Sequence, residues 1–489
     1  MTFKKSIAVI GAGAAGICAA KHMLEAGFDV TVYEIGSRAG GMWVFQNDNG
    51  RSSAYSTLHI NTARNLTSFS DFEFEASVPP CPSHRDMARY LARYAEHFGV
   101  RPRIRFNTKV ERVSPAADYS EDKPVWEVEI AGGEIARYDS VIVATGHLTK
   151  PLEVPALRDA FTGEYLHSHH YKEPAPFVGK RVCVVGVGNS ALDIASDLAT
   201  VTPRLVLVAR SNAFIFPKLV FGRPFWDVVK GLYKPWVPAS MRNRIVRALV
   251  WIVQGEMSAL GFPATAKKVH ATSNANILNH IRYQRVVVKQ GIQSIEGRRI
   301  AFSDGTSEEF DTLIAATGYL IDIDFVDSRV IAPKDNGLDL YMRMVPPVWR
   351  GIYFLGFLNS DSALNWIAEG QSRWISEHEA GRAKLPSRPE MLNEIDARAA
   401  WVRETYKDTP RHGIEVEHMP YFADLKRTLR EAQRRAGAPI ADVGIGAVNR
   451  MEAARRVAAV YLGRALLDSS YGLMRRVSRR LCLTYASMM

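Results

Sequence analysis

Two segments of the chain share one pattern of apolar and polar positions. Each has a short apolar run, a glycine-rich turn, a stretch with apolar residues at helical spacing, and a second apolar run. The first reads SIAVIGAGAAGICAAKHMLEAGFDVTVYE (6–34) and the second KRVCVVGVGNSALDIASDLATVTPRLVLVAR (180–210). This pattern predicts strand, turn, helix and strand in each segment. We therefore expect an α/β protein with two Rossmann-like dinucleotide-binding units.

Two shorter runs, VIVATGH at 141–147 and LIAATGY at 313–319, are each typical of a buried strand that ends in Thr-Gly. Two unrelated strand ends would not explain their similarity. We interpret them as the places where the chain leaves the first unit and returns to it. The second unit, residues 156–318, is then inserted into a discontinuous first unit made of residues 1–155 and 319–440.

The first turn has the spacing G-x-G-x-x-G. Gly11 permits the tight turn, Gly13 lets the backbone approach a pyrophosphate, and Gly16 allows the helix to pack closely on the strand. Backbone amides at the start of the helix then face the phosphates. Glu34 ends the second strand, where its carboxylate can accept hydrogen bonds from a ribose 2′-OH. This unit is predicted to bind an adenine dinucleotide with a free ribose.

The second turn repeats the design with one conspicuous change. Gly186 and Gly188 hold the first two positions, and Ala191 replaces the third glycine. The unit ends in Arg210 where the first ends in Glu34. A carboxylate repels a 2′-phosphate, whereas a guanidinium binds it through charge-assisted hydrogen bonds. We infer NADPH here; a solvated cation at a strand end is the open alternative for Arg210.

Two dinucleotide sites of different preference indicate a tightly held FAD and an exchangeable NADPH, with hydride passing from the second to the first. The predicted FAD contacts from these motifs are Gly11, Gly13, Gly16, Glu34, Thr145 and Gly146. The predicted NADPH contacts are Gly186, Gly188, Asn189, Ser190, Arg210, Thr317 and Gly318.

Composition narrows the class of protein without choosing a function. The chain has 489 residues and a formal net charge of +11, which favours anionic partners such as phosphorylated cofactors. No stretch reaches the roughly 18 apolar residues of a membrane-spanning helix, and the N-terminal apolar run is too short for a signal peptide. The cysteines, at 18, 81, 183 and 482, form no C-x-x-C pair. We therefore expect free thiols in a reducing compartment and exclude a disulfide reductase.

The connection between the two units carries the spacing F-x-G-x-x-x-H-x-x-x-Y, met by Phe161, Gly163, His167 and Tyr171. It resembles the fingerprint of the flavin-containing monooxygenases, within the class B flavoprotein monooxygenases. The segments GGMW, INTARNLTSFSDFEF, FSDGT and AEGQSRW are also similar to that family, and the resemblance spans about residues 5 to 395.

The resemblance implies an NADPH- and O2-dependent oxygenase that acts through a C4a-hydroperoxyflavin. It implies further FAD contacts at Gly41, Trp43 and Gln371, with Gln371 and Asn365 as candidate pocket residues. It places Asn61 beside the flavin, where the amide can both donate and accept hydrogen bonds; a turn residue in HINTARN is the alternative. A soft amine or sulfide attacks the distal oxygen without an enzymatic base, as in N,N-dimethylaniline monooxygenase activity. The absence of a Ser-His-Asp pattern is therefore expected.

The fingerprint is interpreted as a hinge between the two units. Gly163 is expected to give freedom at a sharp turn, Phe161 and Tyr171 to anchor the linker by packing, and His167 to hydrogen-bond across the hinge. His169 and His170 lie outside the pattern and are expected to be exposed. The three histidines lack the spacing of a helical ligand pair, so we predict no metal site.

Three alternative functions stay open. A Baeyer-Villiger monooxygenase of the best-known type has Trp at the last fingerprint position, where this chain has Tyr171, but a second type shares the Tyr-Lys ending. A non-oxygenating NADPH oxidase and a flavin-binding scaffold are the other two.

Two regions depart from the dinucleotide pattern. The aromatic and basic insertion at about 214–265 is either a wall of an apolar substrate channel or an interfacial segment, and the periodic apolar residues of MRNRIVRALVWIV favour a helix packed on its own domain. The extension at 441–489 is predicted to be a basic helix that binds anionic lipid, a second copy of the chain, or only solvent. We expect a cytoplasmic protein, with peripheral membrane contact and a homodimer as options, a small amine or sulfide and O2 as substrates, and no nucleic acid.

Overall fold

The computed structural model describes residues 4–233, 237–264, 268–406 and 412–440. The predicted basic extension at 441–489, with Cys482, lies outside these residues.

The first sheet has five parallel strands in the order β22-β7-β1-β2-β3. Their bounds are β22 Ile352–Phe354, β7 Ser140–Val143, β1 Ser6–Ile10, β2 Asp29–Tyr33 and β3 Ile104–Arg105. The apolar run SIAVI forms a strand because helices cover the sheet, and four of its five residues are buried. This is the first predicted unit.

The second sheet has the equivalent parallel order, β16-β11-β10-β20-β9. Its bounds are β16 Val287–Lys289, β11 Arg204–Val208, β10 Arg181–Val185, β20 Thr312–Ala315 and β9 Glu164–His167. The runs VIVATG and LIAATG fall on β7 and β20, which hold the same position beside β1 and β10. Their likeness therefore reflects equivalent places in two equivalent sheets.

Each of these two strands supports a glycine turn. Gly11 has φ +102°, and a Cβ there would lie 2.8 Å from the Ala144 carbonyl oxygen; Gly186 has φ +130°, and a Cβ there would overlap the Ala316 carbonyl oxygen. Both conformations exclude other residues. This crowding explains why both turns require glycine.

The chain crosses between the two sheets on two adjacent short strands. β8 (Lys150–Pro151) leaves the first sheet and β21 (Tyr319–Leu320) returns, paired antiparallel to it. The Thr317 hydroxyl donates to the Leu152 carbonyl at 2.6 Å, and the Leu152 amide donates to the Gly318 carbonyl at 2.9 Å. The outgoing and returning segments therefore hold each other.

The fingerprint segment forms β9, an edge strand of the second sheet, and this corrects two expectations. Gly163 does not have a positive φ; it is required because a Cβ would lie 2.7 Å from the Asp311 carbonyl oxygen. His169 was expected to be exposed but is 4% exposed, and burial lowers its pKa to about 4. His170 is exposed, and Phe161 and Tyr171 are buried, as expected.

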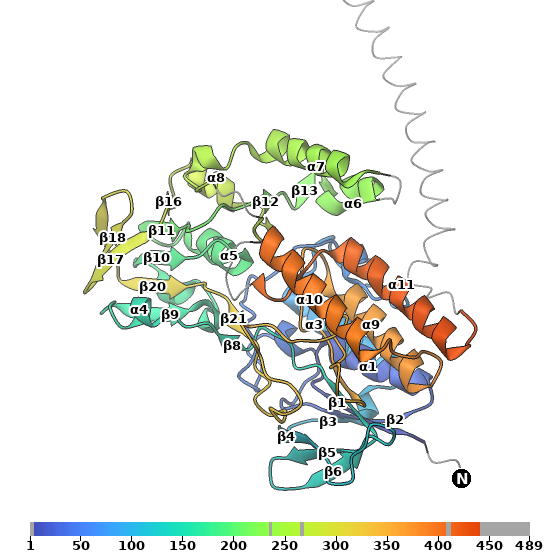
Figure 1. Cartoon of the computed structure of the whole chain (residues 1–489). Coiled ribbons are helices and arrows are strands. Elements are labelled where there is room, and N and C mark those ends of the chain that lie inside the picture. Colours follow the sequence, from blue (N-terminus) through green and yellow to red (C-terminus); the bar gives the residue numbers. More distant parts are fainter. Residues whose placement is uncertain (1–3, 234–236, 265–267, 407–411, 441–489) are drawn as a thin grey trace, which may run out of the picture. The chain divides into compact units, whose positions relative to one another are not determined.

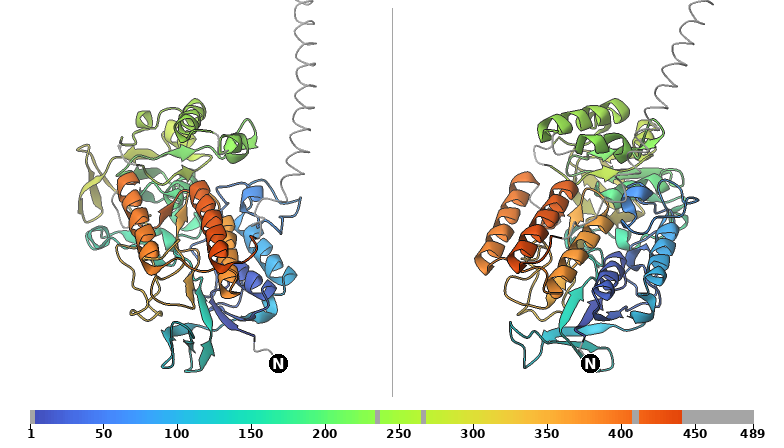
Figure 2. Two further views of the ribbon diagram at one scale, coloured as in Figure 1. Left: turned by 45° about the vertical axis from the view of Figure 1, so that its right-hand side comes forward. Right: turned by 90° about the vertical axis from the view of Figure 1, so that its right-hand side faces the viewer.

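Helices cover the first sheet. α1 (Ala14–Glu25) packs on α9 (Leu364–Glu379), which packs on α11 (His418–Ala436). Figures 1 and 2 show α9, α10 (Arg388–Thr405) and α11 gathered in one group, coloured orange to red. Outside the insertion, the other α-helices of the described residues are α2 Arg64–Thr67, α3 His84–His97, α4 Pro155–Arg158, α5 Asn189–Leu198 and α8 Ile277–Arg282.

Two antiparallel three-stranded sheets flank these layers. One is β4 Val110–Pro115, β5 Trp126–Ile130 and β6 Ile135–Tyr138; the other is β17 Ile292–Glu296, β18 Arg299–Phe302 and β19 Ser307–Glu309. Short strand pairs complete the fold, namely β12 Ile215–Phe216 with β15 Thr272–Ser273, β13 Leu219–Val220 with β14 Arg223–Pro224, and β23 Asn359–Ser360 with β24 Glu415–Val416.

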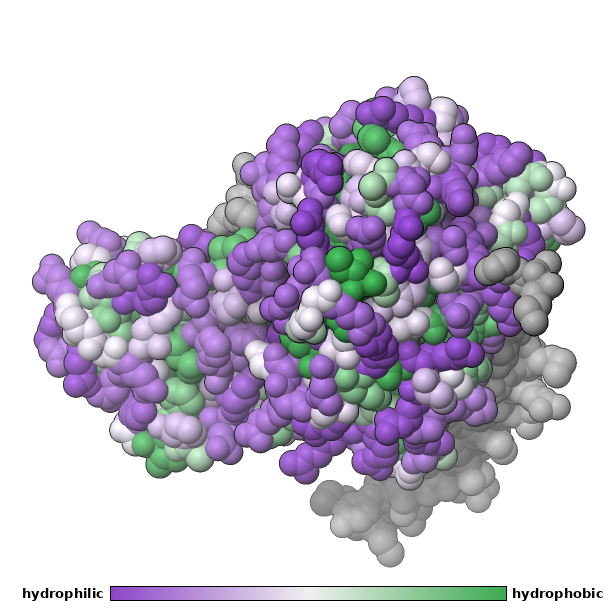
Figure 3. All heavy atoms as spheres, turned by 90° about the horizontal axis from the view of Figure 1, so that it is seen from below, coloured by the Kyte–Doolittle hydropathy of each residue, from purple (hydrophilic) through white to green (hydrophobic). Residues whose placement is uncertain are grey.

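The insertion folds around α6 (Phe225–Val229) and α7 (Ala239–Gln254). Val246 and Val250 of α7 are buried in a cluster with Phe225, as the packed-helix interpretation expects. The opposite face departs from it, because Ile245 and Ile252 remain 41% and 68% exposed. No helix in the described ranges is long and apolar enough to cross a membrane. On the face drawn in Figure 3, hydrophilic residues predominate and hydrophobic ones form small separate groups.

Candidate active site

A cavity of about 970 Å³ is lined by residues that follow the carboxyl ends of strands in both parallel sheets. This is the edge where open α/β sheets bind ligands. The predicted residues that line it are Gly11, Gly13, Glu34, Gly41, Trp43, Asn61, Thr145, Gly146, Gly188, Asn189, Ser190, Gly318 and Asn365. The predicted residues outside the lining are Gly16, Gln371, Gly186, Arg210, Thr317, Phe161, Gly163, His167 and Tyr171.

The first glycine turn forms a cradle for a dinucleotide. The Cα atoms of Gly13 and Gly41 approach closely, since a Cβ on Gly41 would lie 3.0 Å from the Gly13 Cα. Glu34 is 4% exposed and accepts from the amides of Ala12 at 2.8 Å and Gly36 at 2.9 Å. A carboxylate has further lone pairs for a ribose hydroxyl. The residues present therefore fit the diphosphate and ribose of FAD.

Three buried polar atoms on the cavity wall have no hydrogen-bond partner within the described structure. They are Asn61 Oδ1, Thr145 Oγ1 and Thr149 Oγ1. Buried polar groups in proteins are nearly always paired, and an unpaired one costs about 1–3 kcal/mol. These atoms fit a polar cofactor that supplies the missing partners.

The second turn reaches the cavity through the start of α5. Asn189 and Ser190 line it beside Gly188, and Asn189 Oδ1 accepts from the Ser273 amide at 3.0 Å. Arg210 is exposed, two residues after the end of β11. That position beyond the cavity suits the outer adenosine end of a dinucleotide rather than its reactive end.

Arg210→Ala is expected to raise the KM for NADPH about ten- to a hundredfold, because one charge-assisted contact with the 2′-phosphate is lost. The KM for NADH, which lacks that phosphate, should change little. Steady-state kinetics with both nucleotides measure this, and Arg204→Ala, at the opposite end of β11, is the matched control. Equal changes for NADPH and NADH would contradict the assignment.

Gln371 does not line the cavity but hydrogen-bonds to a residue that does. It is fully buried; its Oε1 accepts from the Gly356 amide at 3.3 Å and its Nε2 donates to the Tyr421 hydroxyl at 2.8 Å. Gly356 itself lines the cavity. The structure therefore places Gln371 as a support for the wall, and brings Asn365 to the lining instead.

Acidic residues of α5, in the second unit, accept hydrogen bonds from loop residues of the first unit. The Tyr55 hydroxyl donates to Asp193 at 2.6 Å, and Thr57 donates to Asp197. The fingerprint Tyr171 also donates to Asp197, at 3.2 Å. Burial raises the pKa of both carboxyls. The fingerprint thus contacts the junction of the units through Tyr171, and His167 Nδ1 accepts from the nearby His169 amide at 3.1 Å.

Tyr171→Ala is expected to lower the free energy of unfolding by about 3–5 kcal/mol, because a fully buried aromatic ring is removed. Tyr171→Phe keeps the ring beside Tyr55 and Phe177 and loses only the bond to Asp197, at a cost of about 1 kcal/mol. Chemical denaturation of both variants measures the difference. Equal losses would show that the hydroxyl, not the ring, anchors the segment.

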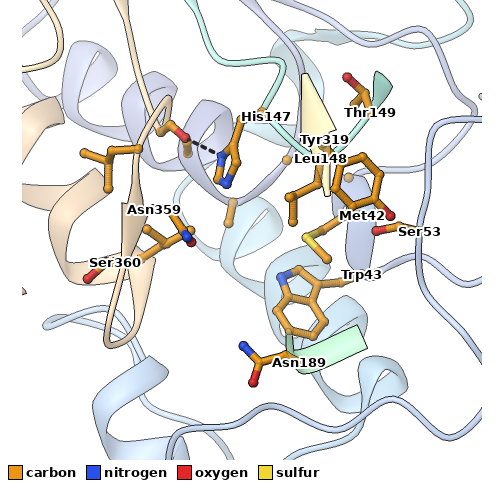
Figure 4. Close-up of a pocket in the computed structure, with 18 of the residues that line it drawn as sticks. Met42, Trp43, Ser53, His147, Leu148, Thr149, Asn189, Tyr319, Asn359 and Ser360 are labelled. Atoms are coloured by element: carbon orange, nitrogen blue, oxygen red, sulfur yellow. Dashed lines mark hydrogen bonds between the residues drawn. The ribbon is translucent and has the colours of Figure 1, made fainter. Parts of the chain in front are cut away.

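Part of the cavity wall was not foreseen. Figure 4 shows Asn359 and Ser360 on one side of the drawn space, Met42, Trp43 and Tyr319 on the other, and His147 between them. His147 Nδ1 lies 3.0 Å from the Gly356 carbonyl, to which it donates, and burial lowers its pKa. The His147 position directly after VIVATG was a usable signal, because it follows a strand that ends at the site.

The insertion supplies Phe216, Phe225 and Trp226 to the cavity. This fits the channel-wall interpretation. No group of three potential ligand side chains able to hold a metal ion occurs in the described part of the chain.

Comparison with known proteins supports one family. A family model described as flavin-binding monooxygenase-like matches residues 4–433. Flavin-containing monooxygenase 5 of Mus musculus is 32% identical over 442 residues, covering 86% of this chain and 83% of that protein. Dimethylaniline monooxygenase [N-oxide-forming] 2 of Rattus norvegicus is 27% identical and covers 86% and 82%.

A solved structure with the same fold is S-allyl-L-cysteine S-oxygenase from Allium sativum. It aligns with a TM-score of 0.66 at 22% identity, covering 92% of this chain and 94% of that one. At 22% identity, this similarity shows a shared fold and nothing more.

Proposed function

Because the chain belongs to the flavin-binding monooxygenase-like family, we propose that it is an NADPH- and O2-dependent oxygenase of soft nitrogen or sulfur centres in small molecules. The family uses FAD and NADPH.

One observation carries the proposal. Residues of both glycine turns, Gly11 and Gly13 from the first and Gly188 and Asn189 from the second, line the same cavity. Two dinucleotides bound there have their reactive ends in one space. Electrons then pass between them without a diffusing carrier.

The protein's part is to bind, orient and exclude water. Bound FAD supplies acceptance of hydride from NADPH and transfer of one oxygen atom from O2 to the substrate. Asn61, with its unpaired buried Oδ1, is proposed to hydrogen-bond the reacting groups. The apolar side chains of Phe216, Phe225 and Trp226 limit access of water and receive an apolar substrate.

The choice of nitrogen or sulfur over ketones has two observations behind it. It draws on Tyr171 at the last fingerprint position and on the N-oxide-forming relative. The Baeyer-Villiger alternative stays open because Tyr171 is followed by Lys172, the ending shared with one type of those enzymes.

The test is product analysis of the FAD-loaded protein with NADPH, O2 and three substrates side by side, namely a tertiary amine, an aryl methyl sulfide and cyclohexanone. N-oxide or sulfoxide formation without lactone supports the proposal. Lactone as the main product favours the alternative, and NADPH consumption that yields only hydrogen peroxide would make the protein an oxidase.

A further inference from the structure

Lys172, which directly follows the fingerprint, joins the second unit to a loop of the first unit, residues 52–57, which we call the strap. Its Nζ donates to the strap carbonyls of Ser52 at 2.8 Å and Ala54 at 3.3 Å. It also donates to the His169 carbonyl of its own segment at 2.9 Å. An ammonium has three N–H donors, so these three carbonyls use all of them.

Converging carbonyls, not a carboxylate, hold this ammonium. Burial alone lowers the pKa of Lys172, so no nearby charge compensates for its lost hydration. Such a group costs stability, and its use is to fix a geometry. Arginine could not replace it, because a planar guanidinium does not aim three N–H groups at converging acceptors. The backbone carbonyl of Lys172 also accepts from the Ser56 amide at 2.8 Å, so side chain and main chain hold the same strap.

The strap is bonded as well to α5, the helix that begins at the second glycine turn. Tyr55 donates to Asp193 at 2.6 Å, and Thr57 donates to Asp197. The first residues of α5 line the cavity where NADPH is predicted to bind. The strap therefore fixes the place of this helix start relative to the first unit.

Both ends of the strap are held in the first unit. At its start, the Ser52 hydroxyl donates to the carbonyl of Met42, which lines the cavity, at 2.7 Å. Just beyond its end, the His84 amide donates to the Leu58 carbonyl at 2.9 Å, on the segment that leads to Asn61. The strap thus connects the wall that carries Asn61 with the unit that carries the NADPH turn.

We propose that Lys172 is a positioning residue for oxygen transfer: by holding the strap, it keeps bound NADP within reach of Asn61 and touches neither. This rests on the proposed function. Lys172 lies outside the cavity lining, whereas Asn61 and the first residues of α5 lie within it. Its effect therefore passes through Asn61, and NADP binding itself does not depend on it.

Lys172→Met removes the three donors and keeps the length of the side chain. Product formed per NADPH is expected to fall about 5- to 10-fold, the factor that corresponds to one lost hydrogen bond, while the KM for NADPH stays within about twofold. Thr57→Val, which loses only the bond to Asp197, should act in the same direction with a smaller effect. Lys180→Met, which loses a bond to Glu164 at the start of β9, is the control and should couple normally.

A double-variant cycle separates positioning from a general loss of stability. If Lys172 acts through Asn61, then Lys172→Met should add no more than about twofold uncoupling to Asn61→Ala, because the amide that it positions is already gone. Multiplication of the two losses would overturn the inference. Normal coupling in Lys172→Met would overturn it as well.

A second readout does not need turnover. In FAD-loaded protein with ¹⁵N-labelled asparagine, the side-chain resonance missing from Asn61→Ala is expected to shift when NADP⁺ is added. In Lys172→Met it should stay in place, although calorimetry should show NADP⁺ bound with a Kd within about twofold of the wild-type value. A shift of the same size in both proteins would contradict the inference. Failure of the wild-type protein to oxygenate any amine or sulfide would instead refute the proposed function, and the resonance would still test the strap.

Discussion

Gly16→Ala is expected to reduce the affinity for FAD by about a hundredfold or more. The Cβ added in α1 would overlap the Gly11 carbonyl oxygen, and Gly11 itself is already packed on Ala144. Neither the Gly11 carbonyl nor the Ala144 backbone can move aside, because Gly11 directly follows β1 and Ala144 directly follows β7, and these two strands pair in the sheet. Moving the start of α1 away from the turn would displace the amides that face the phosphates. A loss of about 3 kcal/mol corresponds to that factor.

The measurement is the flavin content of the purified variant by absorbance, together with a titration of FAD into the apoprotein. Ala191→Gly makes the reverse change at the same position of the second turn and should keep its flavin. Binding of NADP⁺ by calorimetry shows that Gly16→Ala is folded elsewhere. Full flavin content in Gly16→Ala would contradict the role assigned to the first turn.

The features that sequence predicts well here are the local ones. Strands, turns and helices of both dinucleotide units follow from residues within a short stretch, and the positive φ of Gly11 and Gly186 is a local reason for those two glycines. Gly163 shows the limit, because its glycine is required by contact with Asp311, a residue far along the chain on an adjoining segment.

Some residues near the cavity could not be predicted from the sequence, for the same reason. His270 Nδ1 lies 2.9 Å from Glu415 Oε2 although the two residues are 145 positions apart, and the pairing of β23 with β24 places Glu415 beside Asn359, another residue far away in the sequence. Neither carries a motif, so periodicity and spacing say nothing about them. Gln371 is the converse case, since the resemblance placed it at the flavin while its side chain supports Gly356 and Tyr421.

Asn61→Ala is expected to separate NADPH consumption from product formation. NADPH oxidation should stay within about twofold of the wild type, because hydride transfer needs no contact from this amide. Product formed per NADPH should fall about 10- to 100-fold, the factor that corresponds to the loss of a hydrogen bond to a charged group. Hydrogen peroxide should rise to balance the difference.

The surroundings of Asn61 make this variant interpretable. Its segment is held independently of the amide, since the Ile60 amide donates to the Pro82 carbonyl at 2.9 Å and Asn365 Nδ2 donates to the Thr67 carbonyl at 2.7 Å. Removing the side chain should therefore leave the wall in place. Asn65→Ala, on the same segment but exposed and bonded to Asp227, is the matched control.

Asn61→Asp tests hydrogen-bond donation separately from acceptance. It keeps the shape and the accepting oxygen but loses the N–H donor and adds a charge. If donation to the reacting groups is what matters, Asn61→Asp should uncouple at least as strongly as Asn61→Ala. Peroxide and product are measured together in one assay with an aryl methyl sulfide. Normal coupling in both variants would assign Asn61 to the turn of HINTARN alone and move the search for the stabilising donor to Thr145 and Thr149, the other unpaired groups on this wall.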